Sequence, residues 1–292
     1  MKAKLGYFEL VIVVLTALSL GILTLAGRRR PLRISRSSQG VRIPRNLLIA
    51  GLGAWVVNRI ENPLARWACA RAQSKGIGLL QWRPLRGWPA FLMAVLLLDY
   101  TLYLWHILTH RVPWLWRFHR VHHLDADLDT STALRFHAGE MLLSVPWRLL
   151  QILLLGVSLP AFRAWKLLLT LSVLFHHSNL KLSDKTERVL RRWIMTPALH
   201  GIHHSRNLGE MDSNWSSGFT LWDRIHGTLK TGIRQDTIEI GSPDYSGSQS
   251  LWAALTLPFR KPARWSHGDR LFPNRGEEIV GPDAVRVGGG QF

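Results

Sequence analysis

The feature that most restricts how this chain can fold is a nearly uncharged apolar run from Leu5 to Ala26. About 20 such residues are enough for a helix to cross the hydrocarbon core of a bilayer. A cleavable signal peptide is the alternative, because residues 24–26 resemble a cleavage site. The run is longer than the usual signal-peptide core of roughly 7–15 residues, and three arginines follow at once (Arg28–Arg30). We therefore predict an uncleaved membrane anchor.

Three further apolar segments extend from Trp88 to about Leu108, from Met141 to Leu159 and from Ala161 to Phe175. The first is long enough to span a membrane. The other two are near or below that length and contain charged or polar side chains, so a helical hairpin, either spanning or re-entrant, fits better than two independent anchors. An earlier run, Asn46–Val57, is short, and its two glycines weaken it as a helix.

The composition fits a membrane protein better than a soluble one. The 292 residues are 47% hydrophobic and carry a formal net charge of +18. In a soluble protein this charge would indicate nucleic-acid binding. Here the apolar residues stand in long blocks, so we expect the arginines to face anionic lipid and expect no nucleic-acid partner. Because Cys69 is the only cysteine, neither an intrachain disulfide nor a multi-thiolate metal site can form.

The basic loop after the first apolar run sets the expected orientation. Residues 28–45 contain seven arginines and no acidic residue, which the positive-inside rule places in the cytoplasm. If residues 46–57 and the segment starting at Trp88 then cross in turn, all the histidine clusters meet at the cytoplasmic face. Residues 59–86 hold six basic residues against Glu61 alone. An interfacial amphipathic stretch, with residues 46–57 re-entrant, is therefore the alternative.

Ten of the 13 histidines lie in three tight clusters and at two single positions between them. Residues at i and i+4 of a helix share a face, so each H-x-x-H-H run can offer three nitrogens to one point. A mononuclear zinc site takes about three or four ligands, so this supply indicates two metals. Neutral imidazole suits iron, zinc, copper and nickel alike. The ten are His106, His110, His119, His122, His123, His137, His177, His200, His203 and His204.

The other three histidines are interpreted differently. His176 and His177 are neighbours, which point about 100° apart on a helix, so we expect only His177 to bind. His226 and His267 are interpreted as structural or surface residues.

From roughly Leu98 to Thr228, the chain resembles the fatty acid hydroxylase superfamily, also called the sterol desaturase family. The resemblance rests on the ordered set H-x-x-x-H, H-x-x-H-H and H-x-x-H-H with family-like surroundings. The matching stretches are Asp99-Tyr100 ahead of His106, then residues 116–123 (WRFHRVHH), 135–140 (RFHAGE), 175–179 (FHHSN), 196–204 (TPALHGIHH) and 222–228 (WDRIHGT). The chain departs from the pattern at His226, where relatives usually carry an aromatic residue.

The resemblance implies an integral membrane oxygenase with a histidine-rich dinuclear centre, normally of two non-haem iron ions. Such an enzyme hydroxylates or desaturates an aliphatic C–H site of a lipid with O2 as co-substrate. By the resemblance, the eight clustered histidines are metal ligands, and His137 and His177 match further histidine positions of the family. Iron also fits the chemistry, because cleaving an unactivated C–H bond needs redox chemistry that zinc lacks.

Several properties follow as expectations. We find no electron-carrier domain in the sequence and expect a separate donor such as a ferredoxin, a cytochrome or a reductase. A sterol, a fatty acyl chain, an ether lipid or a carotenoid would each suit a site at the edge of an apolar bundle. The Arg- and Trp-rich usage suggests a bacterial inner membrane, with the site facing the cytoplasm.

The sequence thus predicts an all-α protein, namely an integral membrane helical bundle with a cytosolic helical cap that carries the dinuclear site. We divide it into an N-terminal membrane anchor region with basic loops (1–86), a hydroxylase-like catalytic domain (87–232) and a polar C-terminal extension (233–292). Within the extension, Leu251–Phe259 is expected to be an amphipathic or packing segment. The last stretch of the chain is expected to be loosely ordered.

Five carboxylates near the clusters are candidates to orient the imidazoles, and among them we favour Glu140 and Asp223. Two other functions stay open. A zinc-dependent membrane hydrolase would need a general base beside the clusters, for which Glu140 is the candidate. A non-catalytic metal-binding membrane protein would have histidines distributed through its spans. The five carboxylates are Asp99, Asp125, Glu140, Asp212 and Asp223.

Overall fold

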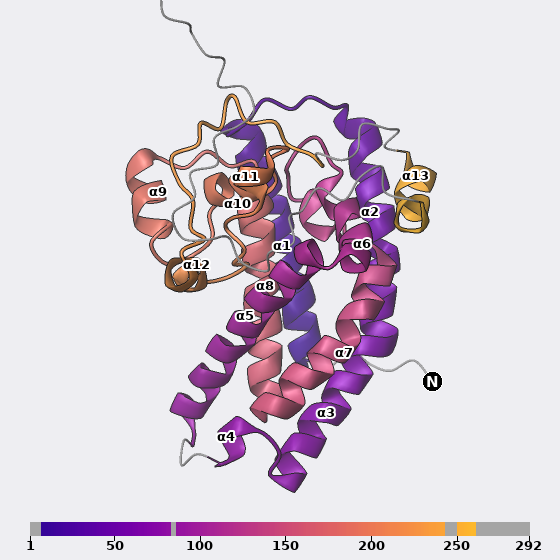
Figure 1. Ribbon diagram of the computed structural model, residues 1–292, viewed down its shortest axis with the longest axis vertical. Coiled ribbons are helices and arrows are strands. Elements are labelled where there is room, and N and C mark those ends of the chain that lie inside the picture. The colour runs from indigo at the N-terminus through magenta and orange to yellow at the C-terminus, as the bar shows by residue number, and fades with distance from the viewer. Residues whose placement is uncertain (1–6, 83–85, 243–249, 261–292) are drawn as a thin grey trace, which may run out of the picture.

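The computed structural model describes residues 7–82, 86–242 and 250–260 (Figure 1). In these ranges the regular structure is helical, and β pairing is limited to isolated bridges, which confirms the predicted all-α class. The elements are α1 (Tyr7–Arg29), α2 (Gln39–Val56), the π-helical turn η1 (Val57–Glu61), α3 (Asn62–Lys75), α4 (Leu79–Trp82), α5 (Trp88–Arg111), α6 (Pro113–His123), η2 (Thr132–Leu134), α7 (Ala138–Leu155), α8 (Leu159–His177), α9 (Asp184–Leu190), α10 (Pro197–His203), α11 (Leu208–Met211), α12 (Leu221–His226), α13 (Leu251–Thr256) and η3 (Leu257–Phe259).

Three of the described helices are long and apolar enough to cross a membrane, namely Leu10–Arg29 of α1, α5 and α7. The N-terminal anchor and the segment starting at Trp88 are thus confirmed as membrane-length helices. α8 is not among them, and its sequence is interrupted by Arg163 and Lys166. α7 ends at Leu155, and the next residue, Gly156, has a φ of 73° that favours glycine. The Ser158 side chain caps the start of α8. The two helices of the expected hairpin therefore form; their depth in the bilayer stays a prediction.

The segment Asn46–Val57 lies within a longer helical stretch, because α2 continues through η1 directly into α3. This continuous path does not contain the re-entrant turn of the alternative, and the crossing of the membrane by this segment stays a prediction. Of the two glycines that weaken this helix in isolation, Gly53 has a role in packing. A Cβ atom at Gly53 would lie 3.1 Å from the Phe136 carbonyl oxygen, so the glycine allows α2 to approach the chain that leads into α7.

The long helices pack in two sets. α7 lies along α2 and α3, whereas α8 lies along α1 and α5. Leu98, Ile152 and Trp165 are buried where α5, α7 and α8 meet. The short helices α9 to α12 form a cap at one end of the bundle, and α4 lies at the opposite end (Figure 1). Side chains at the upper ends of α5, α6 and α8 therefore face the cap.

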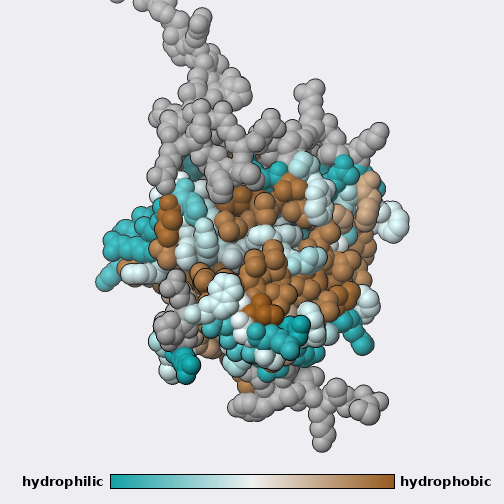
Figure 2. Space-filling model, turned by 60° about the horizontal axis from the view of Figure 1, so that its bottom comes forward, coloured by the Kyte–Doolittle hydropathy of each residue, from teal (hydrophilic) through white to brown (hydrophobic). Residues whose placement is uncertain are grey.

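The outside of the bundle is apolar, as expected for contact with lipid. Leu18 and Ile22 of α1, Trp55 of α2 and Leu154 of α7 are all more than half exposed. Figure 2 shows apolar side chains covering much of the face that is turned forward there. Burying these side chains in hydrocarbon removes the cost of exposing them to water.

The C-terminal segment Leu251–Phe259 is confirmed as a packing segment. It forms α13 and η3, and its Ala254 and Leu257 are buried against Ile49 of α2 and Val121 of α6. The rest of the predicted extension from residue 261 on, including His267, lies outside the described residues.

Candidate metal centre

The grouped histidines come from α5, α6, α8 and α10, whose ends meet where the bundle adjoins the cap. α5 supplies His106 and His110 in its last two turns and ends at Arg111. One extended residue, Val112, separates it from α6, whose first residue is Pro113. This tight connection folds α6 back so that its histidines face those of α5. His177 is the last residue of α8, and α10 supplies the third cluster.

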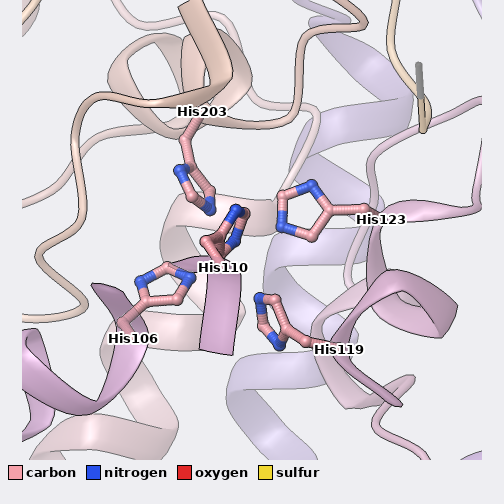
Figure 3. Close-up of side chains that lie close together, drawn as sticks. All are labelled: His106, His110, His119, His123 and His203. Carbon is pink, nitrogen blue, oxygen red and sulfur yellow. The ribbon is translucent and has the colours of Figure 1, made fainter. Parts of the chain in front are cut away.

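The structure gathers nine of the ten predicted histidines into two neighbouring groups, and all nine are buried. Each imidazole of a group offers one nitrogen atom, and the nitrogen atoms offered within a group all lie within 4.8 Å of one another. Figure 3 shows the larger group, whose rings converge from three helices on a common centre. The larger group is His106, His110, His119, His123 and His203, and the smaller group is His122, His177, His200 and His204.

The division of the two H-x-x-H-H runs differs from the expectation that each run points three nitrogens to one place. The first and last histidines of each run, at i and i+4, stay together, but the middle one joins the opposite group. His122 of α6 lies with the α10 histidines, and His203 of α10 lies with the α6 histidines. Positions i+3 and i+4 point about 100° apart on a helix. The middle histidine of each helix can therefore point into the group formed mainly by the facing helix.

In the larger group, the outer nitrogens are fixed by hydrogen bonds that leave the inner nitrogens facing the centre. The Nδ1 atoms of His106, His119 and His203 donate, respectively, to the Trp215 carbonyl (2.6 Å), to Glu140 Oε1 (2.8 Å) and to the Ser213 carbonyl (3.0 Å). In the described part of the chain, the buried Nε2 atoms of His119 and His203 have no hydrogen-bond partner. This arrangement is typical of metal-ligating histidines, because the outer bond sets the tautomer of the ring.

In the smaller group, hydrogen bonds alone cannot satisfy the imidazoles. His177 Nδ1 donates to the Val173 carbonyl at 2.9 Å, so its Nε2 is an acceptor in the neutral ring. That Nε2 lies 3.0 Å from His122 Nε2 and 3.1 Å from His200 Nε2, and His200 Nε2 lies 3.1 Å from His204 Nε2. If His200 donates to His177, it cannot also accept from His204. A cation shared by the four lone pairs would remove this conflict.

The protonation states also suit metal binding. Burial, and then the neighbouring imidazoles, lower the pKa of His200 and His204 well below the ordinary 6.5. The pKa of His203 is lowered to about 3 by burial and by its histidine neighbours. Neutral imidazole is the form that binds metal, so these side chains are ready to act as ligands at neutral pH.

The two favoured carboxylates both support the site, at different distances. Glu140 accepts directly from His119. Asp223 accepts from the backbone N–H groups of Trp215 (2.9 Å) and Ser216 (3.0 Å). It thus holds the loop whose carbonyl accepts from His106. The other three carboxylates have different partners: Asp99 accepts from Trp222 Nε1, Asp125 pairs with Arg42 and Asp212 pairs with Arg111.

The other three histidines that the structure describes lie outside both groups. His137 caps the start of α7, where its Nδ1 accepts from the Gly139 N–H (2.9 Å) and its Nε2 donates to the Leu255 carbonyl (3.2 Å). His176 packs against His200 with ring centroids 4.0 Å apart and the ring planes tilted by 49°. His226 lies 3.2 Å from the Tyr100 hydroxyl.

The sequence reasoning did not identify the loop that supplies the Ser213 and Trp215 carbonyls. The loop turns at Asn214, which adopts a φ of 55°. The Asn214 side chain donates to the Leu199 and Lys230 carbonyls. A polar run containing an asparagine, the residue type besides glycine that most readily tolerates this conformation, was the available signal.

A cavity of about 540 Å³ connects both histidine groups to the interior of the helix bundle. Its walls come mainly from α2, α5, α7 and α8, and it reaches His106 and His119 of one group and His122, His177 and His200 of the other. Leu102, Met141, Leu169 and Val173 are among its apolar lining. The site therefore faces a space suited to an apolar chain.

Comparison with known proteins assigns the family of the segment that holds these groups. Residues 91–228 match the family model described as fatty acid hydroxylase. This segment belongs to the fatty acid hydroxylase family. The matched segment contains all nine grouped histidines, Glu140, Asp223 and the loop that includes Ser213 and Trp215.

The chain is similar to several proteins whose names are those of lipid hydroxylases or monooxygenases. An ornithine lipid hydroxylase of Rhizobium tropici is 31% identical over 181 residues, which are 61% of this chain and 53% of that protein. Human cholesterol 25-hydroxylase is 30% identical over 48% of this chain and 51% of its own length. Human alkylglycerol monooxygenase is 31% identical over 47% and 30%. The chain thus spans about half, or less, of the length of these relatives, and no solved structure matches it significantly.

Proposed function

We propose that this protein is a membrane-bound di-iron oxygenase that hydroxylates or desaturates an aliphatic C–H site of a lipid, using O2 and electrons from a separate donor. The observation that carries the proposal is the pair of buried histidine groups opening onto one largely apolar cavity. Membership of the fatty acid hydroxylase family supports the same reaction class.

We propose that each histidine group holds one iron ion, with the nine grouped histidines as ligands. His137 is left out of this ligand set because hydrogen bonds to Gly139 and Leu255 engage both of its nitrogens. When bound, two irons would supply the redox chemistry that O2-dependent C–H cleavage needs and that zinc lacks.

The protein's own residues orient the ligands and pack against them. Glu140 and the Ser213 and Trp215 carbonyls hold three of the rings by their outer nitrogens. Phe136 stacks on His122 with ring centroids 4.3 Å apart, and the buried Trp215 ring lies 4.7 Å from that of His110. Such packing fixes the rings and supports the productive geometry.

The arrangement of the basic loop supports the proposed orientation. Arg33, in the arginine-rich loop after α1, donates to the Pro197 carbonyl at the start of α10 with an Nη2–O distance of 2.6 Å. The basic loop and the histidine groups are therefore at the same end of the bundle. The positive-inside rule then favours a site that faces the cytoplasm, where a ferredoxin, cytochrome or reductase could deliver electrons. A bacterial inner membrane fits the same reasoning.

The hydrolase alternative is less well supported by the position of Glu140. A general base should be able to reach the water that it activates, whereas one Glu140 oxygen already accepts from His119. Glu140 therefore serves better as a partner that orients a ligand.

Metal analysis of anaerobically purified protein tests the proposal. We expect about two irons per chain in the wild type, lost in part in His203→Ala and retained in His226→Ala, a matched histidine outside both groups. Two zinc ions that persist after iron-supplemented expression would instead favour a hydrolase. Iron-loaded protein should then be supplied with a reductase and screened against ornithine lipids, sterols and alkylglycerols, the substrate types named in the relatives.

A further inference from the structure

The cavity below the histidines also contains charged side chains that the proposed chemistry does not use. Glu61 of η1, Arg148 of α7 and Lys166 of α8 all line it. Glu61 and Arg148 are only 5% and 7% exposed. Ionisable groups are costly at membrane depth, so they mark candidate functional positions whose partners should be sought.

The charges of this group do not balance. Lys166 Nζ donates to Glu61 Oε1 and to Asn62 Oδ1, each at 2.8 Å. Arg148 donates to Gln151, and its guanidinium carbon lies 4.4 Å from the centroid of the Trp165 ring. It forms no salt bridge with any residue that the structure describes, and its buried Nε has no hydrogen-bond partner there. Two cations and one carboxylate leave one net positive charge in this group, and the other carboxylate that lines the cavity, Glu140, lies at the histidine end and accepts from His119.

This charged group lies at a distance from the histidines. Arg148 follows Glu140 by eight residues along α7, which corresponds to about 12 Å at the rise of an α-helix. Lys166 precedes His177 by eleven residues along α8, or about 16 Å. Between the two ends, Leu169 and Val173 of α8 and Met141 of α7 give the cavity an apolar wall.

We propose that Arg148, supported by Lys166, binds an acidic group of the lipid substrate. This proposal rests on the proposed oxygenase function and narrows its substrate class to acidic lipids. A bound anion would balance the net charge, and a guanidinium can hold a carboxylate or a phosphate through paired hydrogen bonds. A fatty acid carboxylate and a lipid phosphate share this chemistry. Because about 12–16 Å separates the charged group from the histidines, the oxidised carbon lies far along the chain from the acidic group.

Equilibrium binding to the purified full-length protein in detergent tests this proposal without any turnover. The probes are a long-chain fatty acid, its methyl ester and the lysophosphatidate with the same chain. We expect the wild type to prefer one or both acids over the ester by about tenfold, near the lower end for hydrogen bonds to a charged group. Arg148→Gln should remove this preference, and Arg148→Lys, which keeps the charge but not the paired donors, should keep only part of it. Whichever of the two acids binds more tightly identifies the bound group as a carboxylate or a phosphate.

The control is Arg71→Gln, which removes one charge from an exposed position on α3 outside the cavity. Equal binding of acid and ester by the wild type, or the same loss of preference in Arg71→Gln, would overturn the proposal. The circular dichroism spectrum and the thermal midpoint of each variant check that the bundle still folds. If the protein lacks iron or oxygenase activity but keeps the Arg148-dependent acid preference, the proposed function fails while the acid-binding site stands.

Discussion

Replacing Glu140 tests whether the hydrogen bond to His119 helps to hold a metal ion. The Glu140 oxygen and His119 Nδ1 are 2.8 Å apart, and both side chains are buried. Removing such a partner of a metal-ligating histidine typically costs about 10–100-fold in metal affinity, or about 1.4–2.7 kcal/mol. A carboxylate forms a charge-assisted bond that is roughly twice as strong as a neutral one. We therefore expect Glu140→Leu near the upper end of this range and Glu140→Gln, whose amide oxygen still accepts, near the lower end.

The two-group arrangement sharpens this prediction. His119 belongs to the larger histidine group only, so one of two bound irons should be weakened while the other is retained. An anaerobic competition titration with a chromophoric iron chelator would resolve the two binding steps. The control is Asp99→Asn, which alters a buried carboxylate that accepts from Trp222 Nε1 and from the Phe219 N–H. Equal weakening of both steps, or the same loss in the control, would refute the assigned role of Glu140.

Further predictions follow from the same contacts. His203→Ala should abolish lipid oxygenation by reconstituted protein while His226→Ala retains it; near-wild-type turnover by the first would contradict the ligand assignment. Metal-free protein should lose stability as the pH falls from about 6.5 towards about 3, because the pKa of His203 is lowered to about 3 in the folded state while unfolded histidines protonate near 6.5. Thermal unfolding in the presence of a chelator checks this, and a flat profile below pH 6.5 would refute it. Gly78→Ala should destabilise the bundle by about 1–3 kcal/mol, because a Cβ there would lie 2.1 Å from the Gly156 backbone nitrogen; an unchanged denaturant midpoint would argue against this packing. Cleavage of the cap by protease added to the periplasmic side of intact spheroplasts would contradict the proposed cytoplasmic orientation.

Helical segments and their apolar character were predictable because both depend on neighbouring residues. The run starting at Trp88 became α5 with little change at its start. The run Asn46–Val57 is more regularly helical than its glycines suggest, because they were weighed only as helix breakers. Gly53 lies where α2 passes close to the Phe136 carbonyl, a contact between segments more than 80 residues apart that local sequence does not reveal.

The partners of the histidines were only partly predictable. Glu140 was expected beside the clusters, since a carboxylate is visible in the sequence as an acceptor. The carbonyls of Ser213 and Trp215 were not expected, because every residue has a carbonyl and its direction depends on the loop conformation. Asp223 was correctly associated with the site, but it acts through the backbone of that loop.

The sequence by itself determined that the chain is a helical membrane protein and that it carries enough clustered histidines for two metal ions. Apolar length and helical periodicity act over one or two dozen residues, so they can be read without knowledge of the fold. Only the tertiary structure decided that His122 and His203 exchange groups, that His137 caps a helix and that Arg148 faces the cavity below the histidines. These outcomes depend on how distant helices pack against one another, and the side chains that fix that packing come from segments far apart in the chain.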